Sequence, residues 1–379
     1  MINLQQEFPL DPHVIYLNHA AVAPWPQRTV QAVSNFANEN GKTGAQYYPK
    51  WLAVERQLKK QLAQLIHAPS DDDIALLKNT SEGLSLIAYG IAWQPGDEII
   101  ISDQEFPSNR IVWESLGSKF GVVLRQVSIN GPDPESAIAQ QITPRTRLLS
   151  ISSVQYGSGF KMDLARLGAL CHQHRVLFCI DAIQSLGCES FDAQAYQADF
   201  VVADGHKWML GPEGTALFYA RPQAREQLQL LQYGWHMVAE PGDYDQQAWE
   251  PHPGAQRFEC GSPNMLGIHA LQASTELILE IGVTTIQHEL NLRIDYLSKE
   301  LAKLTPNLSI LTPPEPFRRA GILTFQINGL NHSQLHRQLM NKQVICAQRA
   351  GGIRFSPHFH TPYSALEQAL AITKSLLVG

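Results

Sequence analysis

Cysteine is scarce in this sequence, and the few cysteines present follow no metal-binding or disulfide pattern. Their number is odd, they form no CxxC pair, and no histidine lies near them at the spacing of a zinc site. This argues against a disulfide framework and leads us to expect no bound metal. Reduced, mostly buried thiols in a cytoplasmic protein are the simplest interpretation. The five residues are Cys171, Cys179, Cys188, Cys260 and Cys346.

Long apolar runs and clusters of basic residues are also missing. No apolar run approaches the ~20 residues that cross a bilayer, and the N-terminal residues lack the basic start and apolar stretch of a signal peptide. The net charge is −6 and the basic residues do not cluster, which argues against nucleic-acid binding and against a polybasic membrane anchor. We therefore expect a soluble cytoplasmic protein.

What the sequence does contain is an alternation of β-branched apolar runs with helical patterns, typical of an α/β protein with a mainly parallel sheet. The clearest unit spans residues 147–220. Residues 164–174 form an amphipathic helix pattern with Asp163 as its N-cap. The strands expected around that helix are residues 147–154, 176–181, 199–205 and 215–221.

The last 150 residues have a different pattern. They predict a helix over 224–232, a polar stretch to about Pro263, and a long helical region from about Gly267 to Leu304. A final helix is expected to have Thr361 as N-cap and Pro362 at its first position. Between these helices we expect strands at 322–327, 344–348 and 353–357 and a helix at 333–343.

At 379 residues the chain is long enough for two or three domains. We expect a large α/β domain over residues 15–255 and a smaller C-terminal α+β domain over 256–379. Residues 1–14 are expected to form an N-terminal segment.

Lys207 is the first candidate for chemistry. A single lysine is usually a surface residue, but this one lies in GHKWMLGPEG between two predicted buried strands. Asp181 ends the preceding strand, VLFCID. Because ligands in parallel sheets bind beyond the carboxyl ends of the strands, Asp181 and Lys207 could face one pocket.

That pairing fits pyridoxal 5′-phosphate (PLP). The cofactor needs a lysine amine for its Schiff base and a carboxylate that keeps its pyridine nitrogen protonated. The lysine must react as a neutral amine, so burial or nearby positive charge should lower its pKa. Once substrate displaces it, the free amine can act as the general base at the amino acid's Cα.

A phosphate site is expected in LLKNTSEGLSLIAYGIAW, where Asn79, Thr80 and Ser81 precede a helix. Free backbone N–H groups and the helix dipole favour an anion there. A plain capping box between Asn79 and Glu82 is the simpler interpretation of this segment taken alone.

Three segments together resemble a known family. DAIQSLG, ADGHKWMLGPEGTALFYAR and RFECGSPNMLGIHAL resemble the class V aminotransferase family of PLP enzymes, which has fold type I. The resemblance is greatest to the branch of isopenicillin N epimerase-like and cysteine desulfurase-like proteins, and it runs from about Tyr16 to the C-terminal helix. It implies a large PLP domain with a seven-stranded, mainly parallel sheet, a smaller C-terminal domain, and a homodimer.

The resemblance also implies a set of cofactor contacts. Lys207 would be the Schiff-base lysine, Asp181 the carboxylate at the pyridine nitrogen, and Gln184 the partner of the phenolic oxygen. Phe106 would stack on the ring, at a place where cysteine desulfurases use histidine. The phosphate contacts would be Thr80, Ser81, His206 and, from the neighbouring subunit, Ser262. Asp204 stands where relatives often have serine, and since a carboxylate cannot donate to phosphate, it could instead hold His206.

Substrate contacts are implied in the same way. Arg354, in GGIRFSPHF, would bind the amino-acid carboxylate, the alternative being a surface ion pair. Arg349 is a possible second contact. Asn18 and His19 lie in an N-terminal segment that approaches the site in relatives, although His19 alone is more often structural. Gln155 and Tyr156 stand where many relatives have an asparagine near the cofactor.

The cofactor is better specified than the reaction. Cysteine desulfurases need a mobile, exposed cysteine on a loop before the carboxylate-binding arginine, and here Cys346 lies within a predicted strand. We therefore expect a PLP enzyme that acts on a small amino acid by transamination or related Cα chemistry. The alternatives are a cysteine desulfurase or selenocysteine lyase, an epimerase, and a catalytically silent scaffold.

Overall fold

The computed structural model describes residues 2–243, 245 and 247–378. Its centre is a seven-stranded sheet in the order β2-β8-β7-β6-β5-β3-β4, within which only β8 runs antiparallel to its neighbours. This is the mainly parallel sheet expected from the sequence, and the α/β prediction is confirmed. The strands are β2 (Ile74–Leu77), β3 (Glu98–Ser102), β4 (Val123–Val127), β5 (Thr146–Ser152), β6 (Leu177–Asp181), β7 (Phe200–Asp204) and β8 (Ala216–Ala220).

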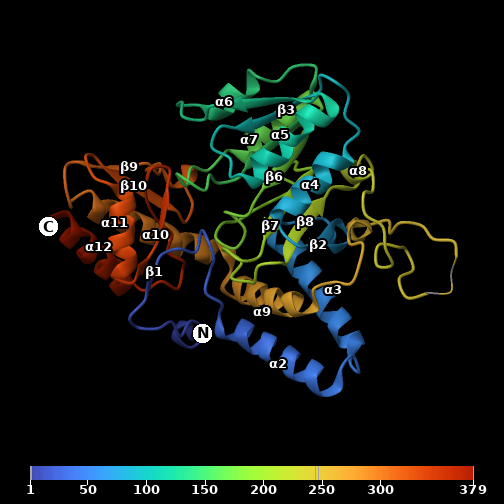
Figure 1. Cartoon of the computed structure of the whole chain (residues 1–379), viewed down its shortest axis with the longest axis horizontal. Helices are drawn as coiled ribbons and strands as arrows, with labels where there is room; N and C mark the ends of the chain where they lie inside the picture. The colour runs from blue at the N-terminus through green and yellow to red at the C-terminus, as the bar shows by residue number, and fades with distance from the viewer. Residues whose placement is uncertain (1, 244, 246, 379) are drawn as a thin grey trace.

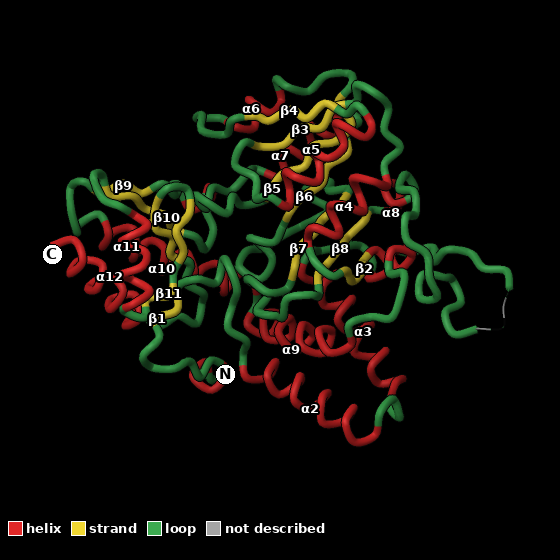
Figure 2. Tube along the Cα trace, in the orientation of Figure 1, coloured by secondary structure: helices red, strands yellow, loops and turns green. Residues whose placement is uncertain are grey.

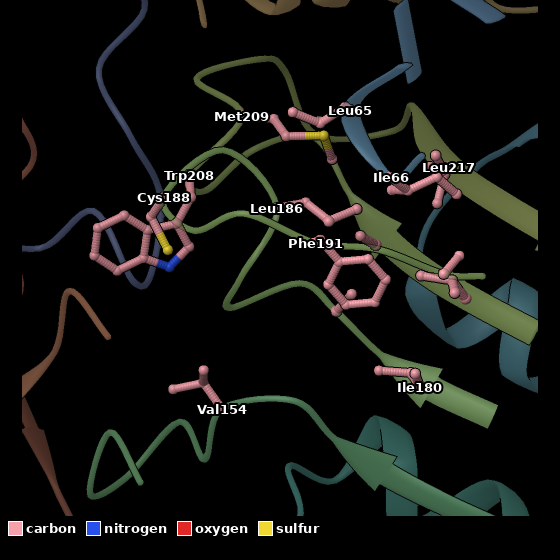
Figure 3. Close-up of a cluster of buried hydrophobic side chains, with 14 of the residues drawn as sticks. Leu65, Ile66, Val154, Ile180, Leu186, Cys188, Phe191, Trp208, Met209 and Leu217 are labelled. Atoms are coloured by element: carbon pink, nitrogen blue, oxygen red, sulfur yellow. The ribbon is translucent and has the colours of Figure 1, made fainter. Parts of the chain in front are cut away.

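Helices cover both faces of this sheet, because its strands are apolar on both sides. Ile99 and Ile101 pack in one core with the helices α4 (Thr80–Gly90) and α5 (Ser108–Phe120). Ile100, on the opposite face by the two-residue period of a strand, packs with α3 (Tyr48–Leu65), α7 (Leu164–His174) and α9 (Met265–Ile281). Figure 1 shows α9 below the sheet beside α2 (Gln27–Thr43). Figure 3 shows part of the second core, in which the Trp208 indole lies next to Cys188.

A second, four-stranded antiparallel sheet has the order β12-β13-β10-β9. Its strands are β9 (Leu308–Ile310), β10 (Leu323–Ile327), β12 (Ala347–Arg349) and β13 (Gly352–Phe355). It lies with α10 (Val283–Leu301), α11 (His332–Asn341) and α12 (Tyr363–Val378) at the end of the molecule that carries the C-terminus (Figure 1). The short elements are α1 (Leu4–Glu7), α6 (Pro134–Ala139), α8 (Pro222–Arg225), η1 (Asp71–Asp73), η2 (Ala255–Phe258) and η3 (Pro316–Arg318).

The N-terminal segment connects the two sheets. Its strand β1 (Ile15–Tyr16) pairs in parallel with β11 (Val344–Ile345), and Asn18 forms a further bridge with Ser356. The domain boundary at residues 255/256 stays a prediction. The helix α9, which that boundary assigns to the smaller domain, packs against α2 and α3.

Two expected helices differ from the structure. The helix predicted over 224–232 ends at Arg225, because Gln229 N–H donates to Gly90 O and draws the chain across the end of α4. Beyond it, residues 226–243 form no further helix and run as a loop (Figure 2). The helical region from 267 to 304 is two helices, separated at Gly282, whose φ of 86° no continuous helix accommodates.

Two boundaries near the C-terminus also differ. The strand predicted over 344–348 is split at Cys346, since β11 pairs with β1 while β12 pairs with β13. The last helix begins at Tyr363, one residue later than expected. Pro362 is its cap, because Pro362 O accepts from the N–H groups of Ala365 and Leu366. No helix among the described residues has the length and apolar character to cross a membrane.

Candidate active site

A cavity of about 270 Å³ lies beyond the carboxyl ends of β6 and β7. Asp181 is the last residue of β6 and Asp204 the last of β7, so the parallel strands bring both carboxylates to one edge of the sheet. Ten of the predicted site residues line the cavity, namely Thr80, Ser81, Phe106, Tyr156, Asp181, Gln184, Asp204, His206, Lys207 and Arg354.

Lys207 lies in the loop between β7 and β8. Backbone hydrogen bonds fold this loop tightly: Gly205 N–H donates to Thr215 O at 3.0 Å and Gly211 N–H to Gly205 O at 2.9 Å. Only 8% of Lys207 is exposed. These two hydrogen bonds close the base of the loop, and the loop keeps the Lys207 side chain inside the protein.

Burial is the main influence on the two charged groups at the centre. It lowers the pKa of Lys207 to about 8, assisted by Arg354 and Arg349 and opposed by Asp181 and Asp204. Burial raises the pKa of Asp181 to about 7, against the Ile183 N–H and Lys207. The lysine is thus disposed to lose its proton, and the carboxylate would be stabilised by a cationic partner.

The helix α4 begins at the cavity. Asn79 is its N-cap and accepts from Glu82 N–H at 2.9 Å, while the Glu82 carboxylate accepts from Lys78 N–H. The N-cap half of the expected capping box is therefore present, while Glu82 accepts from Lys78 N–H in place of the N-cap N–H. This arrangement leaves the Thr80 and Ser81 hydroxyls at the cavity, where Thr80 Oγ1 accepts from Asp204 N–H at 3.1 Å.

Asp204 and His206 lie next to each other on one side of the cavity. The distance from Asp204 Oδ1 to His206 Nδ1 is 3.1 Å, although the two atoms do not have hydrogen-bond alignment. This is the pairing expected if Asp204 holds His206. His206 O also accepts from Ala23 N–H at 2.8 Å, which attaches the N-terminal segment to the cavity wall.

Gln184 connects three parts of the site. Its Oε1 accepts from the Trp208 indole at 2.8 Å, and its Nε2 donates to Ala20 O at 3.1 Å. The residue next to Lys207 and the N-terminal segment are therefore fixed to the turn that follows Asp181.

Phe106 is 39% exposed, with its ring centroid 5.5 Å from Lys207 Nζ and an edge contact to Tyr156. A buried carboxylate, Glu105, fixes the turn that presents it. Glu105 accepts from Ser152 N–H, from Asn109 Nδ2 at 2.8 Å and from Gln155 Nε2 at 3.2 Å. An aromatic ring is thus held over the lysine with one side open to a ligand.

Arg354 is 1% exposed, which contradicts the alternative of a surface ion pair. Its Nη1 donates to Tyr156 O at 2.8 Å and its Nη2 reaches Asn18 Oδ1 at 3.5 Å. Within the described ranges no carboxylate lies within ion-pair distance of this guanidinium. A buried arginine without a counter-ion is suited to binding an anion from solution.

Four predicted residues lie outside the lining of the cavity, one of them the buried Gln155, whose Nε2 donates to Glu105. Asn18 reaches the cavity only through Arg354, and the buried ring of His19 bonds Ser356 O, a structural role. Ser262 is exposed and lines a different hollow, beside Glu259 and Asn264. A contribution of Ser262 to the neighbouring subunit's site stays a prediction.

Cys346 lies between β11 and β12 and is 3% exposed. Burial raises the pKa of its thiol to about 12. The strands β12 and β13 are joined by a turn of only Ala350 and Gly351, so no loop stands before Arg354. These observations agree with the interpretation of Cys346 as a buried apolar residue.

Away from the cavity, Glu55, His236 and Glu259 form a buried group with metal-ligand spacing, which the sequence did not reveal. The Lys59 ammonium lies 2.8 Å from Glu259 Oε1 and 3.4 Å from Glu55 Oε1. An ammonium group of the protein itself thus already pairs with both carboxylates.

The sequence interpretation missed two residues of the site. Ser108 lines the cavity and its Oγ accepts from Ser81 Oγ at 2.8 Å. Glu105 holds in place the turn that contains Phe106. Both stand in EFPSNR, the segment that supplied Phe106, and an acidic residue next to an aromatic one was the available signal.

The cavity fits PLP on its own chemistry. It contains a buried lysine of lowered pKa, a buried carboxylate without a full cationic partner, an open aromatic face and the start of an eleven-residue helix with two hydroxyls. Each of these matches one part of the cofactor: aldehyde, ring nitrogen, ring face and phosphate.

Comparison with known proteins agrees with this fit. The family model described as Aminotransferase class-V matches residues 15–363. A probable cysteine desulfurase of Methanothermobacter thermautotrophicus is 29% identical, over 91% of this chain and 86% of that protein.

Two solved structures show the same fold at lower identity. The cystine C-S lyase C-DES, in complex with its product cysteine persulfide, has a TM-score of 0.90 at 22% identity and covers 97% of this chain and 99% of its own. Another structure of C-DES has glycine covalently linked to the PLP cofactor. The cysteine desulfurase CsdA of Escherichia coli has a TM-score of 0.88 at 23% identity and covers 100% of this chain and 99% of its own.

Proposed function

The chain belongs to the class V aminotransferase family of PLP-dependent enzymes, and from that premise we propose that it cleaves the C–S bond of a cysteine-type amino acid by elimination. The sulfur substrate is supported by relatives named cysteine desulfurase and by the neighbour named as a cystine C-S lyase. The observation that carries the choice of elimination is the two-residue turn between β12 and β13, with Cys346 buried behind it.

We assign the residues of the cavity as follows. Lys207 holds the cofactor, Asp181 faces its ring nitrogen, and Gln184 can donate a second Nε2 hydrogen to its phenolic oxygen. Phe106 covers one face of the ring. The start of α4 with Thr80 and Ser81, together with His206, receives the phosphate. Asp204 keeps His206 in place.

PLP supplies an electron sink that stabilises negative charge at the Cα of a bound amino acid. The protein supplies the proton transfer. Because its pKa is lowered, Lys207 Nζ is available as a neutral amine to take the Cα proton. Arg354 holds the carboxylate and so orients the Cα–H bond toward Nζ.

Elimination from cysteine balances with one water: cysteine and water give pyruvate, ammonia and sulfide. Sulfur leaves from Cβ with the bonding electron pair, and the enamine that remains is hydrolysed to pyruvate and ammonia. No sulfur acceptor on the protein is required. A desulfurase would instead pass sulfur to a protein thiol and release alanine, and Cys346 offers neither exposure nor a thiolate for that step.

Transamination was the leading prediction from the sequence and is retained as a second candidate, because it too needs no protein thiol. It predicts a different product: a keto acid formed without ammonia while a second keto acid is aminated. Epimerisation would return the D-amino acid.

Product analysis on the holoenzyme separates these reactions. With L-cysteine or L-cystine we expect pyruvate and ammonia in equal amounts, together with sulfide or persulfide. Alanine as the main product would replace the proposal by desulfuration, and keto acid without ammonia would replace it by transamination. Lys207→Ala should abolish turnover, with a loss of about a hundredfold or more, while Lys374→Ala, at an exposed position on α12, should leave it unchanged.

We also propose that the enzyme is a cytoplasmic homodimer in which Ser262 completes the partner's phosphate site. Five free cysteines, four of them buried, support the location. The exposed position of Ser262, away from the cavity of its own chain, supports the shared site. Ser262→Ala should weaken PLP binding in the dimer, as measured by equilibrium dialysis.

A further inference from the structure

Arg349 and Arg354 lie on one face of the four-stranded sheet. In the antiparallel pair β12–β13, Ala347 is opposite Arg354, and Arg349 follows Ala347 by two residues. Side chains two apart on a strand share a face, so the two arginines are diagonal neighbours, with Cβ atoms about 7–8 Å apart or somewhat less. Both line the cavity that contains Lys207.

The turn between them fixes this arrangement. Ala350 and Gly351 have φ values of 49° and 73°, the conformation of a tight two-residue hairpin. Gly352 follows, where a Cβ would lie 2.3 Å from Phe325 O. The hairpin therefore packs closely on β10 and leaves the Arg349 side chain at a defined place on the cavity wall.

Neither guanidinium has an acidic partner. Arg354 Nε is buried without a hydrogen-bond partner, and Arg349 Nη1 donates to Gln348 O at 2.7 Å. Across the described positions, no carboxylate oxygen lies within 4.0 Å of either residue. Burial and then Arg349 lower the pKa of Arg354 to about 9, a sign of two unneutralised charges in proximity. The one exposed acid on the lining, Glu213, is in the lysine loop and pairs with neither.

Binding one α-carboxylate uses Arg354 and leaves Arg349 with its charge directed at the same bound molecule. We infer that Arg349 forms a second anion subsite, so that the substrate is an amino acid whose side chain carries a second carboxylate or comparable anionic group. The inference rests on the proposed function for the position of the α-carboxylate, and it specifies the substrate further: the leaving sulfur would bear the second anion. A planar guanidinium suits this role because it binds a carboxylate through two parallel hydrogen bonds.

Two ligands that differ in charge and little in size test the subsite. S-(carboxymethyl)-L-cysteine carries a second carboxylate, and S-(carbamoylmethyl)-L-cysteine carries an amide in its place. Their affinities are measured by calorimetry on holoenzyme reduced with borohydride, which fixes the cofactor on Lys207 and prevents turnover. We expect the carboxylate ligand to bind about tenfold more tightly or better, as a hydrogen-bonded charge pair provides.

Arg349→Gln should abolish this preference, and Arg349→Lys should retain part of it, since the charge remains while the planar fork is lost. Arg337→Gln, which removes an exposed arginine of α11, is the matched control and should keep the full preference. Melting temperatures of all three variants verify that each is folded. If Arg349→Gln does not fold, Arg349→Lys serves as the test variant.

Equal affinity of the wild-type protein for the two ligands would overturn the second subsite, as would a preference that survives in Arg349→Gln. Pyruvate release from the unreduced holoenzyme is scored separately. A protein that prefers the carboxylate ligand through Arg349 but releases no pyruvate retains the subsite and refutes the elimination. Pyruvate release without the preference retains the elimination and refutes the second subsite.

Discussion

Lys207 Nζ lies 5.5 Å from the centroid of the Phe106 ring, a side chain that can neither give nor take a proton. Where a histidine would offer a second acid or base on this side of the cavity, the phenyl ring offers only a surface. Proton transfer at the substrate Cα therefore depends on the charge state of Lys207.

The first prediction concerns the pH at which the apoprotein takes up PLP. Only a neutral amine can attack the cofactor's aldehyde, and burial lowers the pKa of Lys207 to about 8 from its ordinary 10.5. The rate of attachment should rise about tenfold per pH unit below 8 and level off above it. Stopped-flow absorbance after mixing apoprotein with PLP measures this rate.

The pH midpoint of the attachment rate reports the pKa of Lys207. Two variants should shift this midpoint in opposite directions. Asp181→Asn removes the negative charge that raises the pKa of Lys207, so the plateau should begin at lower pH. Arg349→Gln removes a positive charge that lowers it, so the plateau should begin at higher pH. A wild-type midpoint near 10 would contradict the buried position of Lys207.

The second prediction concerns Cys346. Because the thiol is buried and its pKa is raised to about 12, it should resist iodoacetamide at pH 8 in the native protein and react after denaturation in urea. Cys346→Ser should retain turnover within about twofold, since the hydroxyl is only slightly smaller than the thiol and the proposed elimination uses no protein thiol. Mass spectrometry of alkylated peptides and a pyruvate assay measure the two effects. Rapid native labelling, with activity lost in the serine variant, would indicate a sulfur-accepting role.

The third prediction concerns the support beneath the lysine loop. Gly187 has a φ of 98°, and a Cβ there would lie 2.2 Å from Trp208 O, next to Lys207. Gly187→Ala should lower the free energy of unfolding by about 2 kcal/mol and weaken PLP binding, because the backbone at Trp208 must shift. Urea unfolding and equilibrium dialysis measure both quantities.

Gly131→Ala is the matched control, since open space surrounds that position and its φ is not in the left-handed region. It should change the free energy of unfolding by less than about 0.5 kcal/mol. Similar effects of both substitutions would show that Trp208 is not constrained by Gly187.

The fourth prediction concerns three histidines that pack together, the buried His19 and His358 and the half-buried His360, whose two ring nitrogens are buried. Burial lowers the pKa of His19 to about 4 and lowers those of the other two well below 6.5. The unfolded chain therefore binds more protons than the folded one between pH 6.5 and 4, so stability is present above pH 6.5 and is lost as the pH falls.

For His19 alone the loss should be about 2 kcal/mol between pH 7.5 and 5. Urea midpoints at the two pH values measure it. In His19→Gln this share of the pH dependence should disappear while the rest remains. A stability that does not change over this interval would mean that the ring is protonated in the folded protein.

Four strands of the large sheet, β5 to β8, were predicted from the sequence because each is a short apolar run bounded by a helical pattern or a loop. The strands β3 and β4 were not predicted. The helix expected over 224–232 was wrong for a tertiary reason: the bond from Gln229 N–H to Gly90 O selects an extended chain that no local pattern records. The break in the predicted strand at Cys346 also has a tertiary cause, since the residues before Cys346 pair with β1 and the residues after it pair with β13.

The candidate site was predictable where topology concentrates it. Asp181, Asp204 and Lys207 follow strands whose carboxyl ends share an edge, so sequence order alone places them together. Glu105 was not found, because its partner Ser152 stands 47 residues away at the end of β5. The sequence does not show that Arg349 and Arg354 lie close together on one face of the sheet, because this depends on the register between β12 and β13.

The parallel pairing of β1 with β11 has a consequence for the order in which this protein is made. Ile15 pairs with Val344, more than three hundred residues later in the chain, so this pairing cannot form before Val344 has been synthesised. The cavity wall formed by Ala20, Ala21 and Val22 is thus completed only after that later strand has been made. Closing so long a loop is slow, and until it closes a nascent chain has its lysine and its strand-end carboxylates but not the closed pocket. The closed pocket that would receive the cofactor therefore forms only after residues 344–345 have been synthesised.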